Sequence, residues 1–185
     1  TNIKRWSVGS PIQGALDLLF DLIRSENVRA KDVEKIVARV YAGGARTTDN
    51  REMPDINLQH MCALMLVDGH VTFDSAHDVK RMKDPRVLAL RKKVELIADE
   101  EFERLRPVKH YTIDLTLKDG RTLHRHTDAV RGTTQNPMTR AEVGEKCLGL
   151  MAPILGKARA RALCEAVWSI EKIKDVRRLR PLLQA

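Results

Sequence analysis

The sequence has few aromatic residues. Only 4% of its 185 residues are Phe, Trp or Tyr, so aliphatic side chains and methionine must fill the core. Proteins that bind single-stranded nucleic acid stack bases on aromatic rings. The basic stretch from residue 157 to residue 180 has few such rings, although the net charge of +8 leaves polyanions, anionic small molecules and acidic protein surfaces open as partners. We expect no nucleic-acid partner and interpret this stretch as a solvated helix face or a docking surface.

Cysteine is also scarce. The three residues, Cys62, Cys147 and Cys164, are widely spaced and odd in number, and each falls among apolar residues in a predicted helix. This pattern is typical of free thiols in a reducing compartment rather than of a disulfide framework. We therefore expect buried free thiols and a cytoplasmic location.

Several functional motifs are missing. No apolar run approaches the roughly 20 residues of a membrane span, so we expect no membrane partner. The sequence has no glycine-rich phosphate loop, no G-x-S-x-G and no paired-cysteine zinc motif. His124 and His126 form a pair on one face of a predicted strand, but zinc sites need three or four ligands. We expect no metal site.

Hydrophobic periodicity predicts the first helix. Apolar side chains recur at helical spacing from Ile12 to Ile23. Ser10 suits the N-cap position and Pro11 the first helical position. A second buried helix follows with Asp55 as its cap and ends at Asp68-Gly69, whereas the polar residues 45–54 indicate a loop.

Alternating side chains predict four strands. They cover residues 32–41, 94–98, 111–117 and 121–128, and Asp119-Gly120 marks a hairpin turn between the last two. Because helices and strands are interleaved and the sheet ends in a hairpin, the prediction is an α+β fold with a mainly antiparallel four-stranded sheet.

After the last predicted strand the sequence pattern changes. Residues 131–137 indicate a linker, and the pattern beyond it is entirely helical, beginning with a capping box formed by Thr139 and Glu142. We therefore predict an α+β domain over residues 1–131 and a helical segment over residues 132–185. The apolar faces of this segment need a covering surface, which a further domain or a second subunit would supply. We also expect the chain to be a piece of a longer protein, because a functional-looking segment begins only a few residues from Thr1.

Two places carry candidate functional residues. Lys4 and Ser10 precede the first helix, whose N-terminus attracts anions, although Ser10 could serve only as a cap and Lys4 only as a surface lysine. His60 lies near the polar start of the second helix and could transfer protons, since imidazole titrates near neutrality. A purely structural role of His60 is the competing interpretation.

Three segments stand out together: the opening stretch over residues 4–13, residues 54–69 with their Leu-Val-Asp-Gly end, and residues 131–139, which read Arg-Gly-Thr-Thr-Gln-Asn-Pro-Met-Thr. In this order they resemble the MmgE/PrpD family, which includes 2-methylcitrate dehydratase, cis-aconitate decarboxylase and iminodisuccinate epimerase. The resemblance covers the chain but only the carboxy-terminal part of a typical member. It implies a smaller lid-like α+β domain, helices that return to a missing N-terminal helical domain, an active site between the domains and a homodimer.

The resemblance also implies residue roles. Lys4 matches a family lysine and is expected, with His60, to be catalytic, while Ser10, Gln13 and Asn57 are expected to bind substrate. Gly9 stands where the family has a histidine, and His60 stands where many members have a tyrosine. The implied function is that of a lyase or isomerase without a cofactor, acting on a small di- or tricarboxylate such as 2-methylcitrate. A non-catalytic binding or assembly module of the same fold is the alternative.

Overall fold

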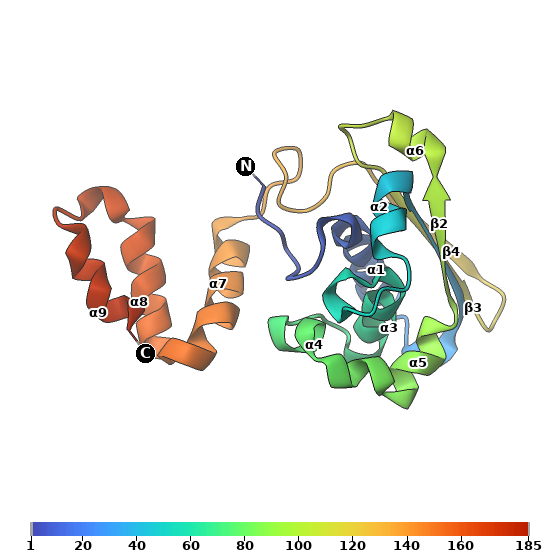
Figure 1. Ribbon diagram of the computed structural model, residues 1–185, viewed down its shortest axis with the longest axis horizontal. Helices are drawn as coiled ribbons and strands as arrows, with labels where there is room; N and C mark the ends of the chain where they lie inside the picture. Colours follow the sequence, from blue (N-terminus) through green and yellow to red (C-terminus); the bar gives the residue numbers. More distant parts are fainter. Residues whose placement is uncertain (1, 185) are drawn as a thin grey trace. The chain divides into compact units, whose positions relative to one another are not determined.

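A computed structural model describes residues 2–184, which form two compact units (Figure 1). The first unit ends at Pro137 and the second begins at Met138. The predicted boundary at residue 131 is six residues earlier. The first unit contains the sheet and the helices α1 (Gln13–Ser25), α2 (Ala42–Thr48), α3 (Leu58–Asp68), α4 (Phe73–His77), α5 (Pro85–Arg91) and α6 (Glu100–Arg104).

The sheet has four strands in the order β2-β1-β3-β4. Their bounds are β1 (Val33–Tyr41), β2 (Val94–Asp99), β3 (Tyr111–Leu117) and β4 (Thr122–Thr127). β1 pairs antiparallel with β3, and β3 pairs antiparallel with β4. β1 pairs parallel with β2, with Ile36 opposite Val94. The expected four strands are confirmed, but the sheet is mixed rather than purely antiparallel, because the helical crossover through α3 and α5 returns the chain in the direction of β1.

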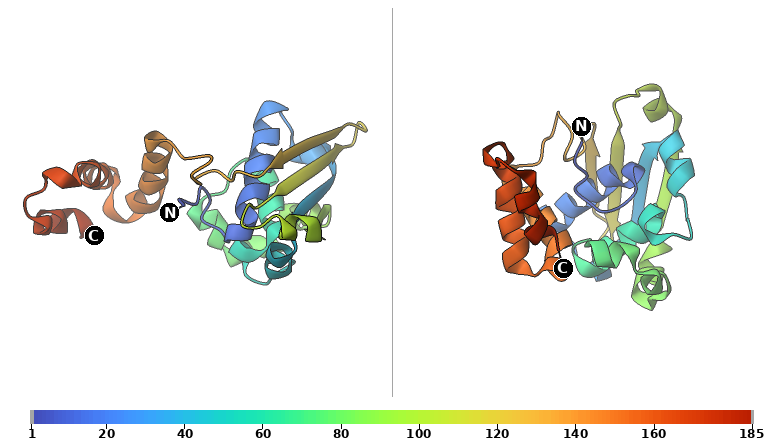
Figure 2. Two further views of the ribbon diagram at one scale, coloured as in Figure 1. Left: turned by 90° about the horizontal axis from the view of Figure 1, so that it is seen from above. Right: turned by 60° about the vertical axis from the view of Figure 1, so that its left-hand side comes forward.

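Helices α1 and α3 cover one face of the sheet (Figure 1). The core is mainly aliphatic, as the scarcity of aromatic residues predicted, and Leu16, Leu19, Leu64 and Met65 are fully buried in it. It also contains the aromatic residues Trp6, Phe20, Tyr41 and Tyr111. The opposite face carries polar side chains, including the ion pair of Lys35 with Glu95 at 2.7 Å. The turn of the β3–β4 hairpin projects beyond the helices (Figure 2).

Helix caps differ from the sequence prediction at two places. Ser10 begins a short 3-10 turn that ends at Ile12, and its side chain does not cap it; α1 starts only at Gln13. The cap of α3 is Asn57, whose side chain accepts from the His60 backbone N–H at 2.9 Å, and not Asp55. Asp55 lies too far ahead of α3 to cap it, because residues Pro54–Ile56 form a separate 3-10 turn.

The predicted loop over residues 45–54 is partly helical. Helix α2 occupies residues Ala42–Thr48 directly after β1. The sequence pattern did not predict α2, because the helix contains two glycines and glycine disfavours helix interiors. Here Gly44 is required by packing, since a Cβ at that position would lie 2.6 Å from the Tyr41 ring.

The second unit consists of helices, chiefly α7 (Arg140–Leu155) and α8 (Lys157–Trp168), followed by the short α9 (Arg180–Leu183). The predicted capping box of Thr139 and Glu142 starts α7. α7 continues through Pro153 to Leu155, although Pro153 has no N–H to donate to the helix. In the part of the chain that the structure describes, no helix is both long and apolar enough to cross a membrane.

Candidate active site

A pocket of about 510 Å³ lies in the first unit, where three distant segments meet. They are the opening segment (residues 2–10), the start of β3 with the residues just before it, and the return loop (residues 128–136) that follows β4. The pocket is lined by backbone and side chains of all three segments, which include the cations Lys4, Lys109 and Arg131 and the hydroxyl groups of Ser10, Thr133 and Thr134. This lining favours an anionic ligand with several oxygen atoms.

The opening segment is held in place by Gln13 at the start of α1. The Trp6 backbone N–H donates to Gln13 Oε1 at 3.0 Å, and Gln13 Nε2 donates to the carbonyls of Trp6 and Val8 at 2.9 and 3.2 Å. The Lys4 ammonium donates to the Val8 carbonyl at 3.1 Å. The Trp6 ring is buried, with its centroid 5.3 Å from that of Phe20. The segment therefore presents Lys4 and Ser10 to the pocket from a fixed backbone.

The return loop is braced by Asn136. Its side-chain Nδ2 donates to the Ala129 carbonyl at 2.9 Å, and its Oδ1 accepts from the Arg131 guanidinium at 2.6 Å. The Gly132 carbonyl accepts from the Ile3 backbone N–H at 2.9 Å, which joins the return loop to the opening segment. Gly132 has a φ of +92°, and a Cβ there would lie 1.8 Å from the Ile3 carbonyl oxygen. Only glycine permits this approach.

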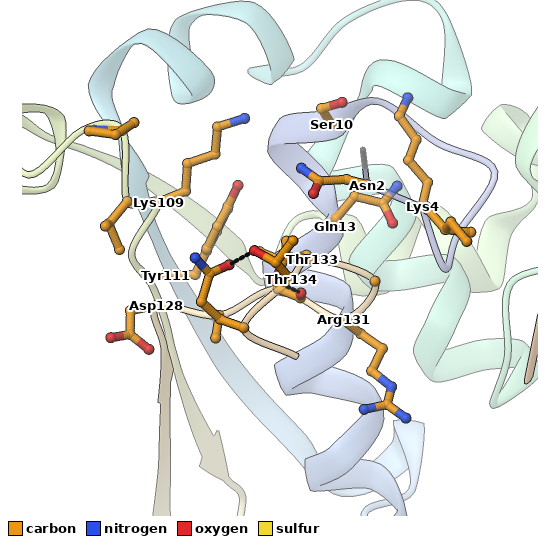
Figure 3. A pocket seen from close by; sticks show the side chains of 17 residues that line it. Asn2, Lys4, Ser10, Gln13, Lys109, Tyr111, Asp128, Arg131, Thr133 and Thr134 are labelled. Carbon is orange, nitrogen blue, oxygen red and sulfur yellow. Dashed lines mark hydrogen bonds between the residues drawn. The ribbon is translucent and has the colours of Figure 1, made fainter. Parts of the chain in front are cut away.

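The third wall comes from the start of β3. Figure 3 shows Lys109 and Tyr111 on one side of the pocket, with Asn2, Ser10 and Gln13 on the other. The guanidinium of Arg131 and the carboxylate of Asp128 extend away from the middle of the pocket (Figure 3). Lys4 and Lys109 are therefore the cations best placed to meet an anion in the pocket.

Beneath the pocket lies a buried carboxylate on α1. Asp17 Oδ1 accepts from the Trp6 indole N–H at 2.9 Å, and Oδ2 accepts from the Arg131 backbone N–H at 3.0 Å. Arg5 is 3.6 Å from Oδ1. Burial raises the pKa of Asp17 to about 6, although both hydrogen bonds and the Arg5 charge act in the opposite direction.

Two of the residues predicted for the site lie elsewhere. Asn57 and His60 are fully buried at the start of α3, and neither lines the pocket that contains Lys4, Ser10 and Gln13. Asn57 caps α3, and both ring nitrogens of His60 are buried without a hydrogen-bond partner. Burial, and then the charges of Arg91 and Arg81, lower the pKa of His60 to about 4. His60 is thus a neutral imidazole near pH 7 and has no access to a ligand in this pocket.

No sequence pattern assigned a site role to Lys109, Tyr111 or the return loop. Lys109 lies on a short connection ahead of a strand, and nothing in its neighbourhood distinguishes it from other surface lysines. The return loop did carry a signal, because its Arg-Gly-Thr-Thr stretch is one of the segments that resemble the family. Its position against the opening segment, however, depends on tertiary contacts.

The histidines of the sheet form pairs rather than a larger cluster. His124 Nδ1 lies 2.6 Å from Asp114 Oδ1, and His126 Nε2 lies 3.1 Å from His110 Nδ1. Within residues 2–184, no group of three or more His, Cys, Asp or Glu side chains is arranged to hold a metal ion. Cys62 is buried and Cys147 and Cys164 are half-buried, all as free thiols.

Comparison with known proteins identifies the family. The family model described as the MmgE/PrpD C-terminal domain matches residues 6–172 of the chain. The chain belongs to the MmgE/PrpD family. This match confirms the resemblance drawn from the sequence, including its restriction to the carboxy-terminal portion of the family's proteins.

Curated relatives are similar to the MmgE/PrpD chain at moderate identity. Cis-aconitate decarboxylase of Homo sapiens is 27% identical over 69% of this chain, and that of Mus musculus is 26% identical over 84%. Mitochondrial 2-methylcitrate dehydratase of Yarrowia lipolytica is 32% identical over 57%. The aligned regions span 26%, 32% and 22% of the lengths of these relatives, so the chain corresponds to less than a third of each.

Proposed function

We propose that this chain forms the substrate-carboxylate side of a lyase or isomerase active site, in an enzyme that acts on a small di- or tricarboxylate. The observation that carries the proposal is the convergence of Lys4, Lys109 and the hydroxyl of Ser10 on one pocket from segments about 100 residues apart. The relatives support the chemical class, because they are named a decarboxylase and a dehydratase of tricarboxylic acids.

The proposed chemistry is proton transfer next to a carboxylate. Removing a proton alpha to a carboxyl group places negative charge on that group, and a fixed ammonium nearby stabilises this charge in a low-dielectric pocket. Lys4 and Lys109 would hold the substrate carboxylates, and the Ser10 hydroxyl would donate a hydrogen bond to one of them. In this proposal no cofactor takes part.

The groups that move the proton would come from outside this chain. No histidine is among the described residues that line the pocket, and His60 is buried away from it. We propose that a helical domain supplies the acid and base, and that this domain or a second copy of the chain covers the second unit. The exposed apolar side chains of Val167, Trp168 and Val176 support such a covering surface.

Alanine variants test the proposal. In the full-length protein, Lys4→Ala and Lys109→Ala should each lower kcat/KM for cis-aconitate, 2-methylcitrate or iminodisuccinate, whichever is turned over. A hydrogen bond to a charged group contributes about 1.5–3 kcal/mol, which corresponds to a loss of roughly 10- to 100-fold. Lys118→Ala in the exposed hairpin turn is the matched control and should have no effect. Unchanged turnover in both site variants would overturn the assignment.

A second function is a carboxylate-binding module without catalysis. It is favoured by Gly9, which occupies the position of the family histidine and whose backbone N–H donates to the Asp55 carbonyl at 2.9 Å. Turnover by the full-length protein distinguishes the two functions. A binding module would retain saturable affinity for citrate that depends on Lys4 and Lys109, while the full-length protein would turn over none of the three substrates.

A further inference from the structure

One buried side chain, Asp17, makes hydrogen bonds to two walls of the pocket. Asp17 lies on α1 and does not itself line the pocket. One of its carboxylate oxygens accepts from the indole of Trp6 in the opening segment, and the other accepts from the backbone of Arg131 in the return loop. Trp6 and Arg131 are 125 residues apart in the sequence. Arg131 itself lines the pocket, and the opening segment lines it through Lys4 and Ser10 on either side of Trp6.

The hydrogen bonds between and within the two segments do not attach the return loop to α1. The Ile3 N–H joins the two segments through the Gly132 carbonyl, and Asn136 braces the return loop internally. These bonds tie the two walls to each other, but neither ties the return loop to α1. Among the hydrogen bonds described for residues 128–136, the one that reaches α1 is the bond from the Arg131 N–H to Asp17.

We propose that Asp17 is the positioning residue of this pocket: its two carboxylate oxygens hold the opening segment and the return loop at the separation that a bound carboxylate requires. Asp17 acts through Trp6 and Arg131 and does not touch the ligand. The inference rests on the proposed function only where it assumes that the ligand is a carboxylate.

A carboxylate suits this position because it presents two acceptors and no donor. The charged neighbours are Arg5, which is 3.6 Å away, and Asp21 one turn further along α1; the buried phenol of Tyr111 lies on the sheet side. An amide at position 17 would turn an N–H group toward either the Trp6 indole or the Arg131 N–H. The donor that faces this N–H group would then lose its bond to position 17, while the size of the side chain stayed the same. Gln13 still ties the opening segment to α1, so the return loop is the wall that depends on Asp17 for this link.

The test is Asp17→Asn, with Asp21→Asn as the matched control. Asp21 lies on the same helix and is exposed, so the control makes the same change of charge without removing either bond. Two quantities are measured on the chain: amide hydrogen exchange by NMR, and the Kd for citrate. We expect the Arg131 and Gly132 amides of Asp17→Asn to exchange at least tenfold faster, with β1 and β3 unchanged, and the citrate Kd to rise about tenfold. Asp21→Asn should match the wild type in both.

The outcomes separate the two proposals. Unchanged exchange at Arg131, or faster exchange with an unchanged citrate Kd, would overturn the positioning role. A wild-type chain that binds no citrate, with faster exchange at Arg131 in Asp17→Asn, would count against the proposed carboxylate ligand and would leave Asp17 as the anchor of both walls. If Asp17→Asn does not fold, Asp17→Ser provides the same comparison, because its one oxygen cannot occupy the positions of both carboxylate oxygens.

Discussion

At the scale of single residues, the first unit buries two titratable side chains, Asp17 and His60, whose pKa values are shifted in opposite directions from their ordinary values. Asp17 has its pKa raised to about 6, first by burial. His60 has its pKa lowered to about 4, again first by burial. In both cases the buried environment disfavours the charged form. Asp17 is held by two hydrogen bonds, whereas both ring nitrogens of His60 lack a partner.

These two groups predict opposite pH dependences of stability. The folded pKa of Asp17 is above its unfolded value of 3.8, so its contribution is present below that value and is lost as the pH rises through about 6. The folded pKa of His60 is below its unfolded value of 6.5, so its contribution is present above that value and is lost as the pH falls through about 4. Each amounts to about 3 kcal/mol at most.

Single variants should expose each contribution. Between pH 4.5 and 6.5, the free energy of unfolding of Asp17→Asn, measured in urea, should fall as the pH is lowered, because the contribution of His60 is no longer opposed by that of Asp17. In His60→Gln the Asp17 contribution is no longer opposed by that of His60, so the free energy of unfolding should fall more steeply, or rise less, than that of wild type as the pH is raised. The slope of wild type should lie between those of the two variants. A wild-type slope outside that range would contradict the assignment of these pKa values.

At the scale of elements, glycine decides how closely segments approach. Gly14 on α1 faces the ring of Tyr111, which a Cβ would approach to 2.4 Å. Helix α1 can therefore lie directly against the start of β3. Gly132 likewise allows the return loop to approach the Ile3 carbonyl closely, and its positive φ also favours glycine. The pocket thus depends on the absence of side chains at positions that do not bind the ligand.

Gly132→Ala should open the pocket, and Gly120→Ala provides its control. Both residues have a positive φ, of 92° and 90°, so both variants incur the backbone cost of roughly 1 kcal/mol. A Cβ at Gly120 meets nothing within 4 Å, whereas one at Gly132 collides with the Ile3 carbonyl. In thermal unfolding and citrate titration, we expect Gly120→Ala to lose a little stability and to keep its affinity. Gly132→Ala should also lose affinity, by tenfold or more. Equal affinity in the two variants would show that this approach does not shape the pocket.

At the scale of the whole molecule, the two units differ in how much core they have. The first unit holds an extensive aliphatic core beneath the sheet. In the second unit the buried apolar side chains, among its described residues, are Ala160 and Leu163. Helices of this length receive most of their stability from packing an apolar face. The second unit should therefore be much less stable than the first.

Hydrogen exchange of the intact chain should reveal this difference. Amides of α7 and α8 should exchange through local unfolding, many-fold faster than those of β1 and β3, which should exchange only when the first unit unfolds. Leu163→Ala should accelerate exchange in α7 and α8 without changing β1 or β3. Equal protection of the two units, measured by mass spectrometry, would contradict this prediction.

Much of the fold was predictable because its signals are local. The alternation in residues 111–128 with Asp119-Gly120 predicted the hairpin, and the capping box of Thr139 and Glu142 predicted the start of α7. The parallel pairing of β1 with β2 was missed, since strand direction depends on the path of the intervening chain. Of the predicted site residues, Lys4, Ser10 and Gln13 line the pocket and Asn57 and His60 do not.

The sequence by itself determined the four strands, the longer helices, the family and the cation ahead of the first helix. Short-range patterns of apolar residues, caps and turns suffice for these, because each is decided within a few neighbouring residues. Only the tertiary structure decided that Lys109 and the return loop join Lys4 at one pocket, that His60 is enclosed in the core, and that Asp17 holds both walls. The physical reason is that burial and hydrogen bonding between residues over 100 positions apart depend on how the elements pack, and no local pattern records that packing.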